Sequence, residues 1–256
     1  MSSAEKPQIT AICRYPVKGL SPQSLSEVRV KPGGTLPLDR AYAIENGPGR
    51  FDPASPRHLP KINFLMLMRD ERLATLDTEF DADTHELIIK RDGKRVAKGQ
   101  LTTPVGRQLI EQFLAAYMKD SLRGAPRVVS ATGHSFSDVA DKCIHIVNLN
   151  SIRDLSRMLN CDIDPMRFRA NVYIDGLEPW VEFDWLDQEI QIGGDVKAQV
   201  FARTQRCDAT NVDPKTGARD LAIPAALLRG KGHSDLGIYA NIMSEGEIRL
   251  GDDITG

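Results

Sequence analysis

Short strand-like runs separated by glycine- and proline-rich turns recur along most of this chain, and they constrain its fold more than any other feature. Two such runs, 86–91 and 95–98, flank Asp92-Gly93, and Asp-Gly between extended runs is a hairpin signal. The regular alternation of strands and helices that marks a parallel sheet is missing. The sequence therefore predicts a β-rich α+β protein, built on β-barrels or strongly bent sheets with a few helices.

Helical periodicity is confined to a few segments. The clearest one follows Thr103-Pro104, which supply an N-cap side chain and a first-turn proline. A second helix is predicted over 151–159, with Asn150 or Ser151 as its cap.

Composition and charge limit the classes of function. The 256 residues carry a formal net charge of -2 without a basic run, which argues against nucleic acid or an anionic membrane as the main partner. No apolar stretch approaches the roughly 20 residues that span a bilayer, and the N-terminus lacks the apolar core of a signal peptide. We therefore expect a cytoplasmic protein.

The four cysteines, Cys13, Cys143, Cys161 and Cys207, lie far apart. Their spacing fits neither a structural zinc site nor a disulfide framework, so we expect free thiols. Cys207 differs from the others because Arg206 precedes it, and a guanidinium group stabilises thiolate over thiol. A thiolate is a nucleophile and a soft metal ligand. The alternative is that Cys207 is a small buried residue at a strand end.

Two arginines, Arg167 and Arg169, begin a run that is typical of a strand. On a strand they would face the same side, where like charges require an anion or two carboxylates. An apolar run at 62–68 likewise predicts a buried strand. The segment 134–138 holds His, Ser and Asp but lacks the turn that surrounds a catalytic serine, so a serine hydrolase is rejected.

Several segments together resemble one family. YPVKGLSPQSL (15–25) and GGTLPLDRAYAI (33–44) are similar to the N-terminal β-barrel module that precedes MOSC domains, which are named after the C-terminal region of molybdenum cofactor sulfurases. RFRANVYIDG (167–176) and TQRCDATNVDPKTG (204–217) resemble the MOSC domain itself. The resemblance covers nearly the whole chain and, in function, extends to the amidoxime-reducing molybdenum enzymes.

The order in which these segments occur along the chain, compared with the family, implies an N-terminal β-barrel module followed by a MOSC-type β-barrel domain. Residues 121–126 are typical of a connection, so we place the boundary near Leu122, between 1–122 and 123–256. The site is expected at the interface of these two modules, where pockets often form.

The resemblance implies a molybdenum–pterin cofactor (Mo-molybdopterin) whose metal takes a thiolate from Cys207, which is also the expected catalytic residue. It implies the reduction of small N-hydroxylated substrates at the metal. Guanidinium groups offer forked donors to the cofactor's phosphate, and a lysine adds a point charge. The cofactor-binding residues implied by the resemblance are Lys18, Arg40, Arg169, Asn171, Arg206 and Ser151.

Two of these residues have another role open to them. Arg40 could instead pair with Asp39 or with another surface carboxylate. Ser151, like Asn150, aligns with polar contacts to the pterin, but capping the predicted helix is the simpler role, and we favour it.

The chain departs from the family pattern in two motifs. Amidoxime reducers commonly carry Lys-Ser where this chain has Lys18-Gly19, which removes a hydroxyl group near the phosphate. Thr210-Asn211 replaces the usual pair of threonines. A ferredoxin-like segment with clustered cysteines is also missing, so we expect electrons to come from a separate donor protein.

Three functions follow from these observations. The first is a molybdenum-dependent reductase with Cys207 as the metal ligand. The second is a carrier in which Cys207 holds a persulfide or the protein holds the cofactor for delivery to another enzyme. The third is a scaffold whose cofactor site has decayed.

Overall fold

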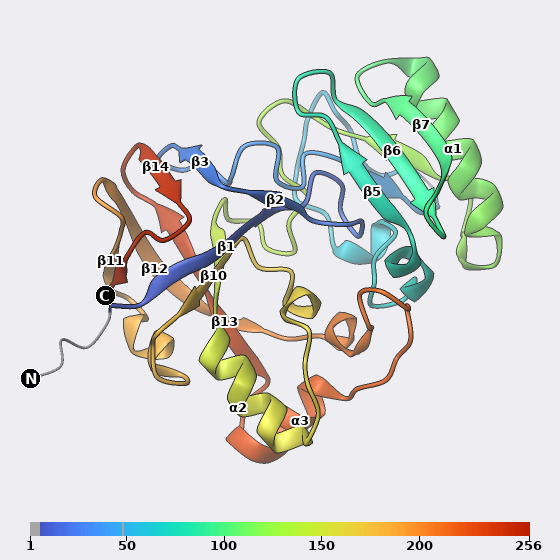
Figure 1. Cartoon of the computed structure of the whole chain (residues 1–256). Coiled ribbons are helices and arrows are strands. Elements are labelled where there is room, and N and C mark those ends of the chain that lie inside the picture. The colour runs from blue at the N-terminus through green and yellow to red at the C-terminus, as the bar shows by residue number, and fades with distance from the viewer. Residues whose placement is uncertain (1–5, 48) are drawn as a thin grey trace, which may run out of the picture.

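The computed structural model describes residues 6–47 and 49–256 (Figure 1). Its strands are β1 (Gln8–Arg14), β2 (Gln23–Leu25), β3 (Glu27–Val30), β4 (Ala43–Glu45), β5 (Asp77–Phe80), β6 (Glu86–Arg91), β7 (Lys94–Gln100), β8 (Arg127–Val129), β9 (Ile144–Asn148), β10 (Val172–Asp175), β11 (Glu189–Ile192), β12 (Val196–Gln205), β13 (Asp235–Ile242), β14 (Gly246–Arg249) and β15 (Ile254–Thr255). Its α-helices are α1 (Pro104–Tyr117), α2 (Leu149–Leu159) and α3 (Ile223–Lys231).

A mixed sheet of eight strands forms the centre of the molecule. Its strand order is β15-β11-β12-β13-β9-β10-β1-β2, and of these neighbours β9 and β10 run parallel. Along β12 the buried residues Val196, Ala198 and Val200 alternate with more exposed ones, as a strand with one face on the core requires. These side chains join a core of aliphatic residues contributed by most strands of the sheet.

A smaller unit is built from the three-stranded sheet β5-β6-β7, against which α1 packs (Figure 1). The hairpin predicted at Asp92-Gly93 is confirmed, since both residues adopt positive φ between β6 and β7. The predicted start of α1 is also confirmed, because the hydroxyl oxygen of Thr103 accepts a hydrogen bond from the Gly106 amide at 3.1 Å. Figure 1 places this unit at one end of the molecule and the helices α2 and α3 at another.

Strand pairing joins early and late parts of the chain. Strand β1 pairs with β10, β3 pairs with β14, and β4 pairs with β8. These ladders cross the boundary predicted near Leu122, which stays a prediction. The predicted fold class is confirmed: a β-rich α+β protein with an N-terminal β-barrel module, a curled half-barrel sheet and, in the described residues, three α-helices.

Some local predictions are wrong. The apolar run 62–68 is not a strand but a short 3₁₀ helix, Lys61–Asn63, followed by turns. Its side chains are nevertheless buried in part, with Leu65 fully enclosed. Asp70 holds the turn, because its carboxylate accepts a hydrogen bond from the Met66 amide at 3.0 Å. Short apolar runs do not distinguish a strand from other buried backbone.

The strand predicted from Arg167 begins only at Val172. Before it lies a 3₁₀ helix, Pro165–Phe168, which Asp164 caps by accepting a hydrogen bond from the Met166 amide at 2.9 Å. The cap of α2 is likewise Asn148 rather than Asn150 or Ser151.

No helix in the described part of the chain is long and apolar enough to cross a membrane.

Candidate functional site

A cavity of about 390 Å³ lies where the early and late parts of the chain meet. Its walls come from the loop after β1, the residues before β4, the 3₁₀ helix Lys61–Asn63, the segment after β8 and the end of β12. The predicted site residues that line it are Lys18, Arg40, Arg169, Asn171, Arg206 and Cys207. The fold therefore brings together residues that are up to 189 positions apart in the sequence, from Lys18 to Cys207.

Cys207 follows the last residue of β12 and precedes the 3₁₀ helix Asp208–Asn211. Its main-chain carbonyl accepts hydrogen bonds from both the amide and the hydroxyl of Thr210, at 3.0 and 2.9 Å, which fix the backbone of the turn. The thiol is half-buried and receives a hydrogen bond from the ammonium group of Lys61, with Nζ 3.2 Å from Sγ. The cation in contact with the sulfur is thus Lys61, which the sequence did not suggest.

Asp138 lies between two lysines at the same end of the cavity. The buried Lys18 ammonium donates to Asp138 Oδ1 at 2.5 Å and to the Phe136 carbonyl at 2.8 Å, while Lys61 Nζ lies 3.4 Å from Asp138 Oδ2. Burial alone would raise the pKa of Asp138, but the two ammonium groups outweigh it and hold that pKa well below its usual range. The carboxylate is therefore ionised, and the predicted phosphate anchor Lys18 already has an anionic partner.

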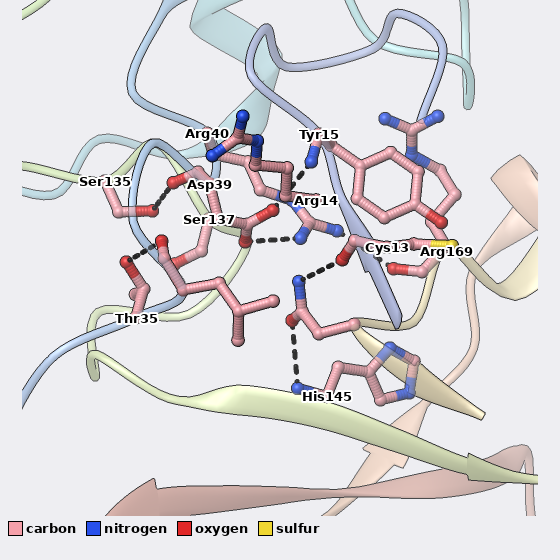
Figure 2. Close-up of polar contacts among 12 residues, drawn as sticks. Cys13, Arg14, Tyr15, Thr35, Asp39, Arg40, Ser135, Ser137, His145 and Arg169 are labelled. Atoms are coloured by element: carbon pink, nitrogen blue, oxygen red, sulfur yellow. Dashed lines mark hydrogen bonds and ion pairs between the residues drawn. The ribbon is translucent and has the colours of Figure 1, made fainter. Parts of the chain in front are cut away.

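Arg40 and Arg169 lie against the ring of Tyr15 (Figure 2). Their guanidinium carbons are 4.3 and 4.2 Å from the ring centroid, within the range of a cation–π contact. Arg40 also pairs with Asp39 at 2.5 Å, which confirms the ion pair that the sequence left open. Within residues 6–47 and 49–256 the Arg169 guanidinium has neither a hydrogen-bond acceptor nor an ion-pair partner, and burial lowers its pKa.

The backbone around these arginines is strained. Arg40 and Arg169 both adopt a left-handed conformation, with φ of 50° and 51°. Such φ values cost about 1–2 kcal/mol for a residue other than glycine, and they persist only where the surrounding contacts impose them. The Arg40 guanidinium supplies one such contact by donating to the Arg169 carbonyl at 2.9 Å.

Asn171 uses its side-chain amide to connect two strands of the large sheet. Its oxygen accepts a hydrogen bond from the His145 amide at 3.0 Å, and its nitrogen donates to the Cys13 carbonyl at 3.1 Å. The residue is 2% exposed. Its polar groups thus have structural partners, although it borders the cavity.

Arg206 lies deep in the cavity wall. It donates to the Phe168 carbonyl at 2.8 Å, and one of its terminal nitrogens lies 3.3 Å from His145 Nε2. Its Nε is buried and has no partner in the described residues. Burial and the neighbouring Arg206 hold the pKa of His145 well below its usual value, so the imidazole is neutral.

Ser151 lies away from the cavity, and Arg167 lines the cavity but is already paired with carboxylates. Ser151 is fully buried at the start of α2, where its hydroxyl donates to Glu182 Oε1 at 2.7 Å and accepts from the Trp180 amide at 2.8 Å. The structure therefore does not bring Ser151 to the other candidates. Arg167 pairs with two carboxylates, Asp213 at 3.2 Å and Asp220 at 2.8 Å, as one of the sequence alternatives proposed.

The two departures from the family motifs have structural explanations. Gly19 has a φ of +84°, and a Cβ there would lie 3.2 Å from the Leu65 carbonyl oxygen, so the position suits glycine. Asn211 is not among the residues that line the cavity, and its side-chain oxygen accepts a hydrogen bond from the Ile223 amide at the start of α3.

Lys61 and Asp138 are the site residues that sequence reasoning missed. Asp138 belongs to the segment 134–138 that was rejected as a hydrolase motif, and Lys61 precedes the misassigned apolar run. Their contacts join residues 120 and 146 positions apart, so no local spacing could have indicated them.

Comparisons with known proteins agree with this architecture. Residues 6–125 match the family model of the MOSC N-terminal beta barrel domain, and residues 131–255 match that of the MOSC domain. A molybdenum cofactor sulfurase of Caenorhabditis briggsae is 24% identical over 91% of this chain and 33% of its own length. The human molybdenum cofactor sulfurase is 22% identical over 83% of this chain and 27% of its own length.

The chain thus spans about a third or less of the length of these curated relatives. Among solved structures, the YUAD protein from Bacillus subtilis is 12% identical and superimposes with a TM-score of 0.46 over 98% of this chain and 94% of its own. The two family models together cover residues 6–125 and 131–255, which is most of the chain. The chain therefore belongs to the MOSC domain proteins, in which the MOSC domain is a molybdenum cofactor-related module preceded here by its N-terminal β-barrel domain.

Proposed function

We propose that this chain binds a molybdenum–pterin cofactor in the cavity, with the Cys207 thiolate as the protein's ligand to the metal, and reduces N-hydroxylated substrates there. One observation carries the proposal: a half-buried thiol and cationic side chains that lack acceptors line the same cavity. Thiolates are ligands for soft metal centres, and guanidinium groups are the preferred partners of phosphate.

The residues of the cavity fit such a group. Seven lysine or arginine side chains line it against two carboxylates, although the chain as a whole has a net charge of -2. Several donors of the cavity wall lack acceptors in the described residues, among them Arg169 and the Nε of Arg206. An anionic ligand would satisfy both, and buried polar groups generally have partners. Lys18 and Arg40, which already bind Asp138 and Asp39, would act on the ligand mainly through their charge.

The cofactor would supply a two-electron reduction of the N–O bond, and the protein would supply binding, orientation and electrostatics. Cys207 would hold the metal, and the backbone of its turn is fixed by Thr210. Arg169, held against Tyr15, would bind the phosphate of the pterin. Apolar side chains such as Phe201 and Tyr239, which also line the cavity, would keep water away from the reacting atoms. Electrons would come from a separate donor protein.

Metal content tests this proposal directly. Wild-type protein, Cys207→Ala and the matched control Cys161→Ala are purified from a host that makes the cofactor, and molybdenum per protein is measured by elemental mass spectrometry. Cys161 is a half-buried cysteine outside the cavity, so its variant should keep the metal. We expect near-stoichiometric molybdenum in wild type and Cys161→Ala, and loss in Cys207→Ala.

The same preparations are then assayed with benzamidoxime and a reduced viologen dye as electron donor. Turnover that depends on Cys207 supports the reductase. Metal absent from all three proteins, in a host where a known molybdoenzyme is loaded, would rule the reductase out.

A carrier of sulfur or of the cofactor is the second candidate function. Two observations favour it: the curated relatives reported above are molybdenum cofactor sulfurases, and the Cys207 thiol can be reached from the cavity. Intact-mass analysis distinguishes the two functions. A persulfide on Cys207 without retained molybdenum supports the carrier, whereas retained metal without a persulfide supports the reductase.

A further inference from the structure

Lys61 has no assigned part in the function proposed above, yet its ammonium group is the one in contact with Cys207. Its Nζ lies 3.2 Å from the sulfur and 3.4 Å from Asp138 Oδ2. The Lys61 side chain is 29% exposed, so its charge can act on molecules that enter from solvent. Its position is fixed by the 3₁₀ helix Lys61–Asn63, whose Asn63 side chain donates to the Pro60 carbonyl at 2.8 Å.

The charges around the thiol do not cancel. Asp138 is the carboxylate next to Lys61, but its closer contact is with Lys18, at 2.5 Å. One carboxylate therefore faces two ammonium groups and leaves a positive charge beside the sulfur. Asp39, the other carboxylate of the cavity wall, is bound to Arg40.

We propose that Lys61 makes the thiol end of the cavity selective for small anionic molecules, and that the substrates of this chain carry a carboxylate or similar anionic group. The claim about the substrates rests on the reductase function proposed above. The claim that the thiol end of the cavity selects anionic molecules does not depend on that function. A unit charge 4 Å from another gains about 1 kcal/mol in water and more in a partly enclosed site, equivalent to about fivefold or more in rate or affinity. The apolar residues Met66, Met68, Phe201 and Tyr239 line the same cavity and would contact the uncharged part of the substrate.

Two alkylating reagents of nearly equal size test the selectivity without any cofactor. Iodoacetate is anionic and iodoacetamide is neutral. In both reactions the sulfur of the thiolate attacks the CH₂ carbon, an S–C bond forms and iodide leaves with the electron pair of the C–I bond. Both reagents consume the same thiolate, so the ratio of their rates does not depend on how much of Cys207 is ionised.

The rates are measured at Cys207 by peptide mass spectrometry on cofactor-free protein and are divided by those of the neutral thiol 2-mercaptoethanol. In wild type we expect the iodoacetate-to-iodoacetamide rate ratio at Cys207 to be about five times the ratio for 2-mercaptoethanol, or more. Lys61→Met should lower it by about the same factor, and Lys61→Arg should keep it. Higher salt should reduce the wild-type ratio, because exposed charges are screened.

Two controls locate the effect. Lys90→Met removes a lysine that pairs with Glu79 on another face of the protein and should leave the ratio unchanged. Cys161, measured in the same digests, should not respond to Lys61→Met, because it lies outside the cavity. Equal ratios at Cys207 in wild type and Lys61→Met would overturn the proposal.

Turnover then tests the substrate class with benzamidoxime and 4-carboxybenzamidoxime, which differ by one carboxylate. On molybdenum-loaded protein we expect kcat/KM to favour the carboxylate about fivefold or more, and Lys61→Met to remove that preference. Equal kcat/KM values for the two compounds would overturn the substrate class. Turnover of neither compound would instead overturn the proposed reductase, while the alkylation ratio still decides the selectivity of the thiol end.

Discussion

The guanidinium group of Arg40 donates a hydrogen bond to the main-chain carbonyl of Arg169, with 2.9 Å between the two atoms. This contact joins the N-terminal module to the MOSC domain at the wall of the cavity. The guanidinium groups of Arg40 and Arg169 both contact the ring of Tyr15. Asp39 forms an ion pair with Arg40 and so neutralises one of these two charges. The second cation remains available to a ligand.

Replacing Arg40 with methionine should lower the free energy of unfolding by about 3 kcal/mol. The reason is that Asp39 is 4% exposed and would lose its ion-pair partner, and breaking a buried pair from one side has this magnitude. Urea unfolding followed by circular dichroism measures the change. Arg29→Met is the control, because the Arg29–Glu245 pair is exposed and should contribute roughly 0–1 kcal/mol. Equal small losses in both variants would contradict the structural role of Arg40.

Asn171→Ala should lower the free energy of unfolding by about 2 kcal/mol or more. The substitution leaves the His145 amide and the Cys13 carbonyl without their side-chain partner, and a buried unsatisfied group costs about 1–3 kcal/mol. Asn63→Ala, which removes an exposed amide, should have a much smaller effect. If Asn171→Ala lost molybdenum while its unfolding curve stayed like that of wild type, Asn171 would be a cofactor contact rather than a link between strands.

Restoring the family's serine at position 19 should destabilise the protein. Gly19→Ser places a side chain at a φ of +84° and a Cβ 3.2 Å from the Leu65 carbonyl oxygen, so we expect a loss of about 1–2 kcal/mol. Gly33→Ser is a matched control, because Gly33 also has positive φ but a Cβ there would meet nothing within 4 Å. The difference between the two thermal unfolding curves measures the crowding at Gly19, and identical losses would show that crowding contributes nothing.

The stability of the chain should depend on pH through Glu182. Burial raises the pKa of Glu182 and outweighs the hydrogen bonds from Ser151 and Asn148 that lower it. Because the folded pKa lies above the unfolded one, the folded state binds the proton more tightly, and stability falls as pH rises from the unfolded to the folded pKa.

Glu182→Gln, which resembles the protonated carboxyl, removes this dependence. Its free energy of unfolding relative to wild type should therefore become more favourable as pH rises from about 4 toward neutrality. Urea unfolding at four pH values checks this, and a difference that stays constant across the series would contradict it.

Local chemistry explains which elements the sequence could predict. The turn at Asp92-Gly93 and the cap at Thr103 depend on residues within a few positions, and both were predicted correctly. The run 62–68 was misassigned because its burial comes from distant elements, and burial alone does not select an extended backbone. The turn before Val172 did have a local signal, Asp164 followed by Pro165, which the pair of arginines obscured.

The residues of the candidate site also fall into two groups, those that a sequence motif indicates and those that only long-range contacts reveal. Family motifs placed Lys18, Arg40, Arg169, Arg206 and Cys207 on one cavity, although their roles there stay predictions. Lys61 and Asp138 belong to no motif, and their roles depend on contacts that form only when the two halves of the chain meet. Ser151 was proposed from an alignment position, whereas its hydroxyl is already used by Glu182 and Trp180.

The pairing of β3 with β14 has a consequence for the way this protein folds. Glu27 lies opposite Arg249, so the ladder joins residues 222 positions apart in the sequence. Closing a loop of this length costs conformational entropy before the paired strands can stabilise the fold. Pairings between distant segments therefore form slowly. The eight-stranded sheet has the same requirement, because its strand β1 pairs with β10 and its strand β11 pairs with β15. The cavity that holds both Lys18 and Cys207 therefore takes its shape only after distant segments of the chain have paired.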